Sequence, residues 1–118
     1  MATYSKQLLS GSNNGMQILI SGTSTSDATS IHTAVAGTTN LDEIWLYASN
    51  NATASINLTT LWGGTSEPTD QSVTPLQSKT GRVLIVDGKL LQNSLVVKTY
   101  ASITNFVSID GFVNRITP

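Results

Sequence analysis

The sequence predicts an all-β fold: a single antiparallel β-sandwich of about eight strands. Three observations predict it. β-branched and aromatic residues dominate short segments, apolar and polar residues alternate in several of them, and clusters of Gly, Asn, Ser, Thr and Asp separate them. No segment has the roughly 3.6-residue apolar spacing of a stable helix. The pattern is typical of a jelly-roll-like sandwich, with an immunoglobulin-like sandwich as the alternative.

The expected strands follow one another along the chain. They span residues 17–20, 29–35, 42–49, 55–62, 71–76, 82–86, 94–101 and 106–116. Asn and small residues at 50–53 predict a hairpin loop, and Asp87–Gly88 predicts a tight turn because both residues tolerate positive φ. The segment 63–70 predicts a longer exposed loop. Residues 1–15 contain one short apolar pair and then a flexible run, so we expect an N-terminal arm before a sandwich domain at 16–118.

The composition limits the classes of partner. Charged residues make up 11% of the chain, whereas 15 Ser, 17 Thr and 9 Asn supply most of its polarity. A surface of this kind packs against neighbouring proteins with few charges to desolvate. The net charge of -1 and the scattered basic residues argue against nucleic acid as a partner. The sequence shows no signal peptide and no apolar stretch of membrane-spanning length, so we expect synthesis in the cytoplasm and no membrane partner.

The titratable residues predict no enzyme and no cofactor. The single histidine, His32, lies in an expected strand, and no G-x-S-x-G nucleophile motif accompanies it, so we interpret it as a hydrogen-bonded structural residue. The chain has no Cys and no further His for zinc. The carboxylate pairs Asp42–Glu43 and Glu67/Asp70 do not fit a calcium loop, and we predict no metal site.

The strand expected at 42–49 is apolar on both faces. Ile44 and Leu46 alternate with Trp45 and Tyr47, so only one of these two pairs can face the core. The other face meets another protein chain or stacks on sugar rings. We favour a protein interface, because sugar sites also carry orienting carboxylates and amides, which the sequence does not place there. The candidate contact residues are Trp45, Tyr47, Leu8, Leu9 and Trp62.

Three stretches support a resemblance. "SIHTAVAGTTNLDEIWLYASNN", "LTTLWGGTSEP" and the terminal "GFVNRIT" resemble small virion structural proteins of tailed bacteriophages, including phages of marine hosts. The resemblance extends from Tyr4 to Thr117, and its anchors are "NLDEIWLY", "GG(T)" and "VNRI". In size and character the chain is similar to capsid decoration, or cement, proteins.

The resemblance implies a role in the virion. Proteins of this type have small β-sandwich folds, and they often sit as trimers on the head shell, where they bridge major capsid proteins. We therefore expect a virion protein that forms a homo-oligomer and binds the major capsid protein. The alternatives are a neck, tail or fibre component, or a carbohydrate-binding module on the virion surface.

Overall fold

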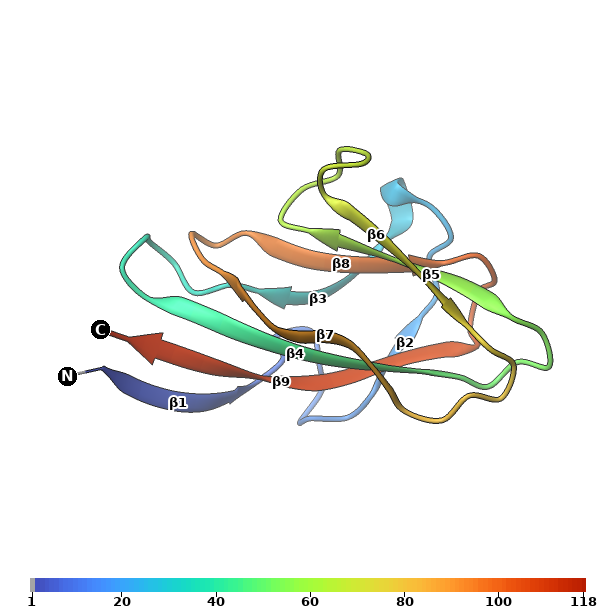
Figure 1. The fold of residues 1–118 in the computed structure, drawn as a ribbon, viewed down its shortest axis with the longest axis horizontal. Helices are drawn as coiled ribbons and strands as arrows, with labels where there is room; N and C mark the ends of the chain where they lie inside the picture. Colours follow the sequence, from blue (N-terminus) through green and yellow to red (C-terminus); the bar gives the residue numbers. More distant parts are fainter. Residues whose placement is uncertain (1) are drawn as a thin grey trace.

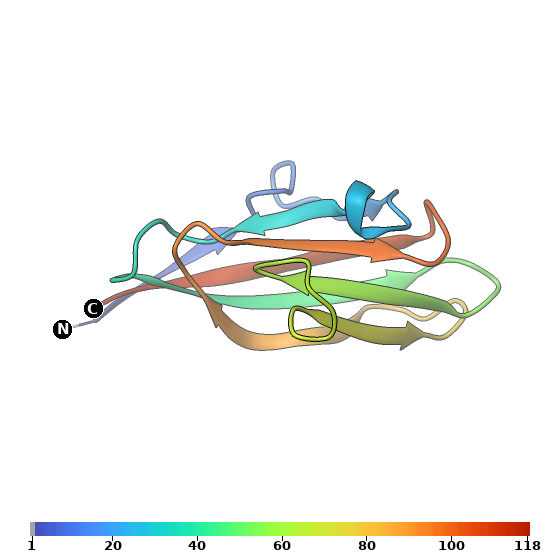
Figure 2. The same cartoon turned by 90° about the horizontal axis from the view of Figure 1, so that it is seen from above.

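The alternating segments of the sequence form two antiparallel sheets that pack face to face (Figures 1 and 2). This computed structural model describes residues 2–118, so Met1 of the expected arm lies outside the described residues. Within them, no helix is long and apolar enough to cross a membrane. The all-β antiparallel sandwich predicted from the sequence is confirmed.

The two sheets have four main strands each. The first sheet has the order β1 (Thr3–Leu8), β9 (Val107–Thr117), β4 (Leu41–Asn50) and β7 (Val83–Leu91), and β2 (Ile18–Ile20) also pairs with β9. The second has the order β3 (Thr29–Thr33), β8 (Val96–Ala101), β5 (Ile56–Trp62) and β6 (Gln71–Leu76). A short 3-10 turn, η1 (Thr25–Asp27), precedes β3.

The strand pairs are nested like the two arms of one long hairpin. β5 pairs with β6, β4 with β7, β3 with β8, and β1 and β2 both pair with β9. β1 and β2 act as two halves of one strand, because β1 covers the C-terminal part of β9 and β2 the N-terminal part. Rolled into two sheets, this nested order is a jelly roll.

Alternation along β4 places the core. Ile44, Leu46 and Ala48 are fully buried, and their neighbours along the strand are only half-buried. The corresponding inward residues of β9 are Val107, Ile109 and Val113, which are also fully buried. Facing strands contribute Ile56 and Leu58 from β5 and Val97 from β8, and together these side chains fill the space between the sheets.

The segment expected to be an arm differs from that expectation. Residues 3–8 form an edge strand that pairs with β9 from Thr3↔Thr117 to Leu8↔Phe112. Leu9 follows with only 2% of its surface exposed, inside the core. The sequence signal is weak because an edge strand with mostly exposed side chains needs little apolar alternation, and its backbone pairing is invisible in the sequence.

The connection at 50–53 is not a hairpin loop. β4 lies in the first sheet and β5 in the second, so the chain crosses between sheets here. Asn50 holds the crossing: its buried amide nitrogen approaches the carbonyl oxygens of Ala54, Leu76 and Gln77 at 3.1, 3.2 and 3.0 Å. Its Oδ1 accepts a hydrogen bond from the Ala52 N–H at 2.9 Å. A buried side chain therefore satisfies the polar backbone of this crossing.

The turn predicted at Asp87–Gly88 is also wrong, because both residues lie inside β7. The pairing of β4 with β7 shifts at Gly88, which makes Gly88 the extra residue of a β-bulge with φ of +83°. The bulge still requires glycine at position 88, since a Cβ atom there would lie 2.8 Å from Cζ2 of Trp45. A second shift in the same pairing leaves Ile85 as an extra residue.

Candidate functional site

The outer face of the first sheet carries a band of aromatic and aliphatic side chains, which we call the aromatic face. Its members are Tyr4 and Leu8 of β1, Phe112 of β9, Trp45 and Tyr47 of β4, and Leu84 and Leu90 of β7. Their positions follow from the alternation, because Trp45 and Tyr47 point away from the buried Ile44 and Leu46. Tyr4, Leu8, Leu84 and Leu90 are 70, 59, 45 and 49% exposed. This is a concentration of apolar surface on one side of a small protein.

Cross-strand pairing brings these side chains into rows. Phe112 is the register partner of both Leu8 on β1 and Trp45 on β4. The rings of Trp45 and Phe112 are stacked, with centroids 6.1 Å apart and planes 12° from parallel. Cross-strand pairs of this kind fix the relative position of large side chains and stabilise the sheet.

Two cations cover rings of the same face. The Nζ atom of Lys6 lies 4.6 Å from the Phe112 ring centroid, and the guanidinium carbon of Arg82 lies 3.6 Å from that of Tyr47. Arg82 also donates a 2.7 Å hydrogen bond from Nε to Oδ2 of Asp110, which is the register partner of Tyr47. Both cations thus contact aromatic rings of the face.

The carboxylate of Glu43 also has partners on the aromatic face. Its Oε1 accepts hydrogen bonds from Nε1 of Trp45 at 2.9 Å and from Nδ2 of Asn114 at 3.0 Å. The bond from Asn114, and secondly that from Trp45, hold the pKa of Glu43 below its usual value, so the group stays ionised at neutral pH. Glu43 and Asp110 are therefore each bonded to another polar side chain of this face, whereas Lys6 contacts a ring.

The candidate contact residues separate into three places. Trp45, Tyr47 and Leu8 come together on the aromatic face. Leu9 lies in the core, and Trp62 lies on the second sheet, where it lines a cleft at the edge of the sandwich. Tyr4, Leu84, Leu90 and Phe112 were not among the candidates, and Phe112 could have been found from its alternation with the buried Val113. Glu43 could also have been placed on this face, from its alternation with Trp45 and Tyr47, but the amide of Asn114 joins it only through the strand register.

His32 forms a buried polar cluster with Asp42 and Arg115. Nδ1 of His32 accepts a hydrogen bond from the Ser10 N–H at 3.0 Å, so the ring proton is on Nε2 and is donated to Oδ2 of Asp42 at 2.8 Å. Both ring nitrogens are thus engaged, and the residue is 2% exposed. This geometry fits the structural role interpreted from the sequence.

Arg115 completes the cluster. Its Nε and Nη2 donate to the two carboxylate oxygens of Asp42 at 2.8 and 3.1 Å, and the Val35 N–H adds a third donor at 3.0 Å. Burial by itself raises the pKa of Asp42, but the hydrogen bonds from Arg115 and His32 outweigh it and lower the pKa below its usual value. The cluster joins β3, β4 and β9 across the two sheets.

The loop carboxylate Asp70 has a local role. Asp70 accepts a hydrogen bond at 3.0 Å from the Ser66 N–H and so closes its own loop. Among residues 2–118, no cluster of three or more His, Asp or Glu side chains is arranged to hold a metal ion.

Comparisons of the chain with protein-family models, with curated proteins and with solved structures find no match.

Proposed function

We propose that the protein is a non-enzymatic structural component of a tailed-phage virion, a cement protein that decorates the head shell and self-associates through the aromatic face. Two kinds of support lead to this proposal. The sequence resembles small virion proteins over nearly its whole length, and one sheet presents the aromatic face to its surroundings.

The observation that carries the proposal is the internal pairing of polar groups on the aromatic face. Glu43 is bonded by Trp45 and Asn114, and Arg82 by Asp110. Covering a polar group is costly mainly when it loses its hydrogen bonds to water without replacement. Because these groups keep their partners, the face can be covered by another chain at a small desolvation cost.

The charge on the face favours a second copy of the same chain. Lys6 and Arg82 are balanced by Glu43 and Asp110, so two such faces meet without net repulsion. Exposed Leu8, Leu84 and Leu90 supply apolar area around the rings. An oligomer, expected to be a trimer from the resemblance, then binds the major capsid protein with several contacts at once, which multiplies a weak single contact.

The buried cluster supports a non-enzymatic role. A general base needs a nitrogen that can reach a substrate proton. In His32 one nitrogen accepts the Ser10 N–H and the other donates to Asp42. We assign this cluster to holding strands together.

Tyr47→Ser is expected to shift the protein from oligomer to monomer, because it removes from the aromatic face the ring that the Arg82 guanidinium contacts. The measurement is the molar mass by size-exclusion chromatography with light scattering. Tyr100→Ser is the matched control: Tyr100 is also half-buried, but it lies on the outer face of the second sheet. A wild-type monomer at every concentration, or a Tyr47→Ser oligomer of unchanged mass, contradicts self-association through this face.

The place on the particle is tested separately. The purified protein is expected to co-sediment with heads of the phage that encodes it, and Tyr47→Ser is expected to bind them more weakly through the loss of multivalency. Binding to isolated tails but not to heads would instead assign the protein to the neck, tail or fibre. Binding to neither would contradict a virion role.

A further inference from the structure

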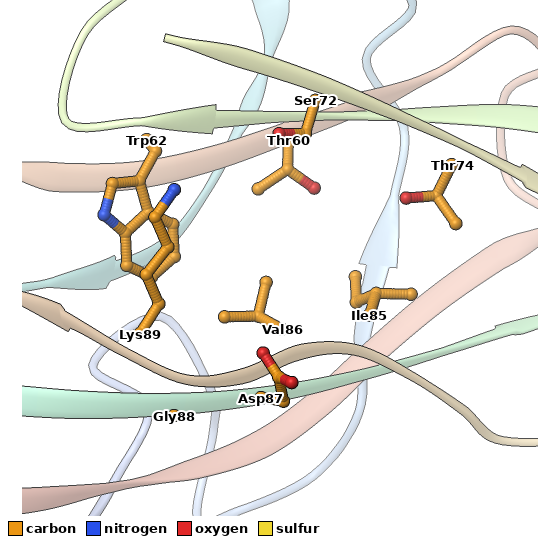
Figure 3. A pocket seen from close by; sticks show the side chains of 9 residues that line it. All are labelled: Thr60, Trp62, Ser72, Thr74, Ile85, Val86, Asp87, Gly88 and Lys89. Carbon is orange, nitrogen blue, oxygen red and sulfur yellow. The ribbon is translucent and has the colours of Figure 1, made fainter.

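The free edges of the two sheets form a cleft on one side of the sandwich (Figure 3). Among residues 2–118, β6 pairs only with β5, and β7 only with β4, so neither strand has a neighbour from this part of the chain on its other side. The space between them has a volume of about 250 Å³. None of the residues that line it is a member of the aromatic face, although Gly88 borders Trp45 at the cleft's margin, and nothing in the proposed assembly role uses it.

Local sequence explains why this part of the sandwich is not filled. Apart from Trp62 at one end, the side chains that β5 and β6 direct into the cleft are short hydroxyl residues: Thr60, Ser72 and Thr74. On the opposite side, the two bulges of β7 place Ile85 and Gly88 as extra residues beside the cleft. Bulges often occur at sheet edges and next to binding sites, because they change the direction of a side chain.

The polar groups of the cleft differ from those of the aromatic face. Five polar side chains line it: Thr60, Ser72, Thr74, Asp87 and Lys89. Within residues 2–118, none of the five hydrogen-bonds or ion-pairs with another residue through its side chain. The cleft therefore presents unused hydrogen-bond donors and acceptors, and the apolar side chain of Val86 lies between Asp87 and the three hydroxyl residues (Figure 3).

An aromatic ring closes one end of the cleft. Trp62 packs partly against the core, and Nζ of Lys89 lies 4.7 Å from its ring centroid. Lys89 is exposed, and its flexible side chain can leave the ring and donate to a ligand at little cost. The tryptophan would then offer an apolar platform beside a carboxylate, an ammonium group and three hydroxyls.

We propose that this cleft binds a neutral pyranose, a single sugar unit of a glycan. The apolar C–H face of such a ring stacks on Trp62, and its hydroxyl groups exchange hydrogen bonds with Asp87, Lys89 and the three hydroxyl residues. One carboxylate and one ammonium group give the cleft no net charge, which favours a neutral ligand over a uronic acid. The ligand is small because the cleft is short.

The test uses nuclear magnetic resonance titration of the full chain with methyl glucoside, galactoside, mannoside and N-acetylglucosaminide. At least one is expected to give saturable shifts of the amide signals at 72–74 and 87–89, and glucuronate is expected to bind more weakly. Asp87→Asn is expected to weaken binding about tenfold, because it removes a charged acceptor. Asp110→Asn, a carboxylate of the aromatic face, is the matched control and should bind unchanged.

Three results would overturn the proposal: no saturable shift at the cleft with any neutral pyranoside, glucuronate bound as tightly as the best of them, or unchanged affinity in Asp87→Asn. Asp87 is exposed, so its substitution leaves the core intact. Repeating the titration with Tyr47→Ser separates this site from the oligomer, since the cleft is expected to bind sugar equally well in a monomer.

Discussion

Asp42→Ala is expected to lower the free energy of unfolding by about 3–5 kcal/mol, the range for removing one partner of a buried ion pair. Asp42 is fully buried and accepts from Arg115, His32 and the Val35 N–H. Without it, the Nε2 proton of His32 loses its acceptor and Arg115 loses both of its bonds. Urea unfolding followed by circular dichroism measures the change.

Asp110→Asn is the control for the effect of burial. Asp110 also pairs with an arginine, Arg82, but the two side chains are 22 and 49% exposed. Its substitution is expected to cost about 0–1 kcal/mol, as for other surface pairs. Equal losses in Asp42→Ala and Asp110→Asn would mean that the His32 cluster does not hold the sheets together.

The same carboxylate gives a pH dependence with a definite sign. The pKa of Asp42 is lower in the folded protein than in the unfolded chain, so in acid the unfolded chain binds the proton first. The stabilising contribution is complete above the usual Asp pKa of about 3.9 and is lost as the pH falls through the folded pKa. Part of the acid sensitivity of unfolding should be absent from Asp42→Ala.

Gly111→Ala is expected to cost at least about 3 kcal/mol, at the upper end of single-residue effects. A Cβ atom at Gly111 would clash with the carbonyl oxygen of Trp45, and that oxygen belongs to rigid backbone in the neighbouring strand. β4 and β9 would have to separate at the register pair Leu46↔Gly111, directly beside Trp45 and Phe112. The change should therefore reduce both stability and self-association.

Gly81→Ala is the control for this substitution, because nothing lies within 4 Å of a Cβ atom at that position. Thermal unfolding of the two variants gives the comparison. A Gly111→Ala protein with wild-type Tm and wild-type mass would contradict the close approach of β4 and β9.

The strands could be predicted because their alternation survives in the sequence, as in β4, where every second residue is buried. β1 could not be predicted from the sequence, since its side chains are mostly exposed and only its pairing with β9 makes it a strand. β7 was expected to end at 86 because Asp87–Gly88 has the composition of a turn. The local sequence does not distinguish a Gly that allows a turn from a Gly that, like Gly88, allows a β-bulge beneath Trp45.

The aromatic face could be predicted in part. Alternation alone places Trp45 and Tyr47 opposite Ile44 and Leu46. Leu8, the last residue of β1, joins them, whereas Leu9, directly after the strand, points into the core. The bond of Asn114 to Glu43 and that of Arg82 to Asp110 join residues distant in sequence, so they depend on a register that one sequence does not reveal.

The covering of Trp45 by a second chain can be measured with Trp62→Phe, in which Trp45 is the one remaining tryptophan. Acrylamide quenching of its fluorescence, followed as the protein is concentrated from monomer to oligomer, reports directly on the exposure of the aromatic face. We predict that quenching falls and the emission moves to shorter wavelength as the mass rises. An oligomer that forms while Trp45 stays as accessible as in the monomer would show that the chains meet elsewhere.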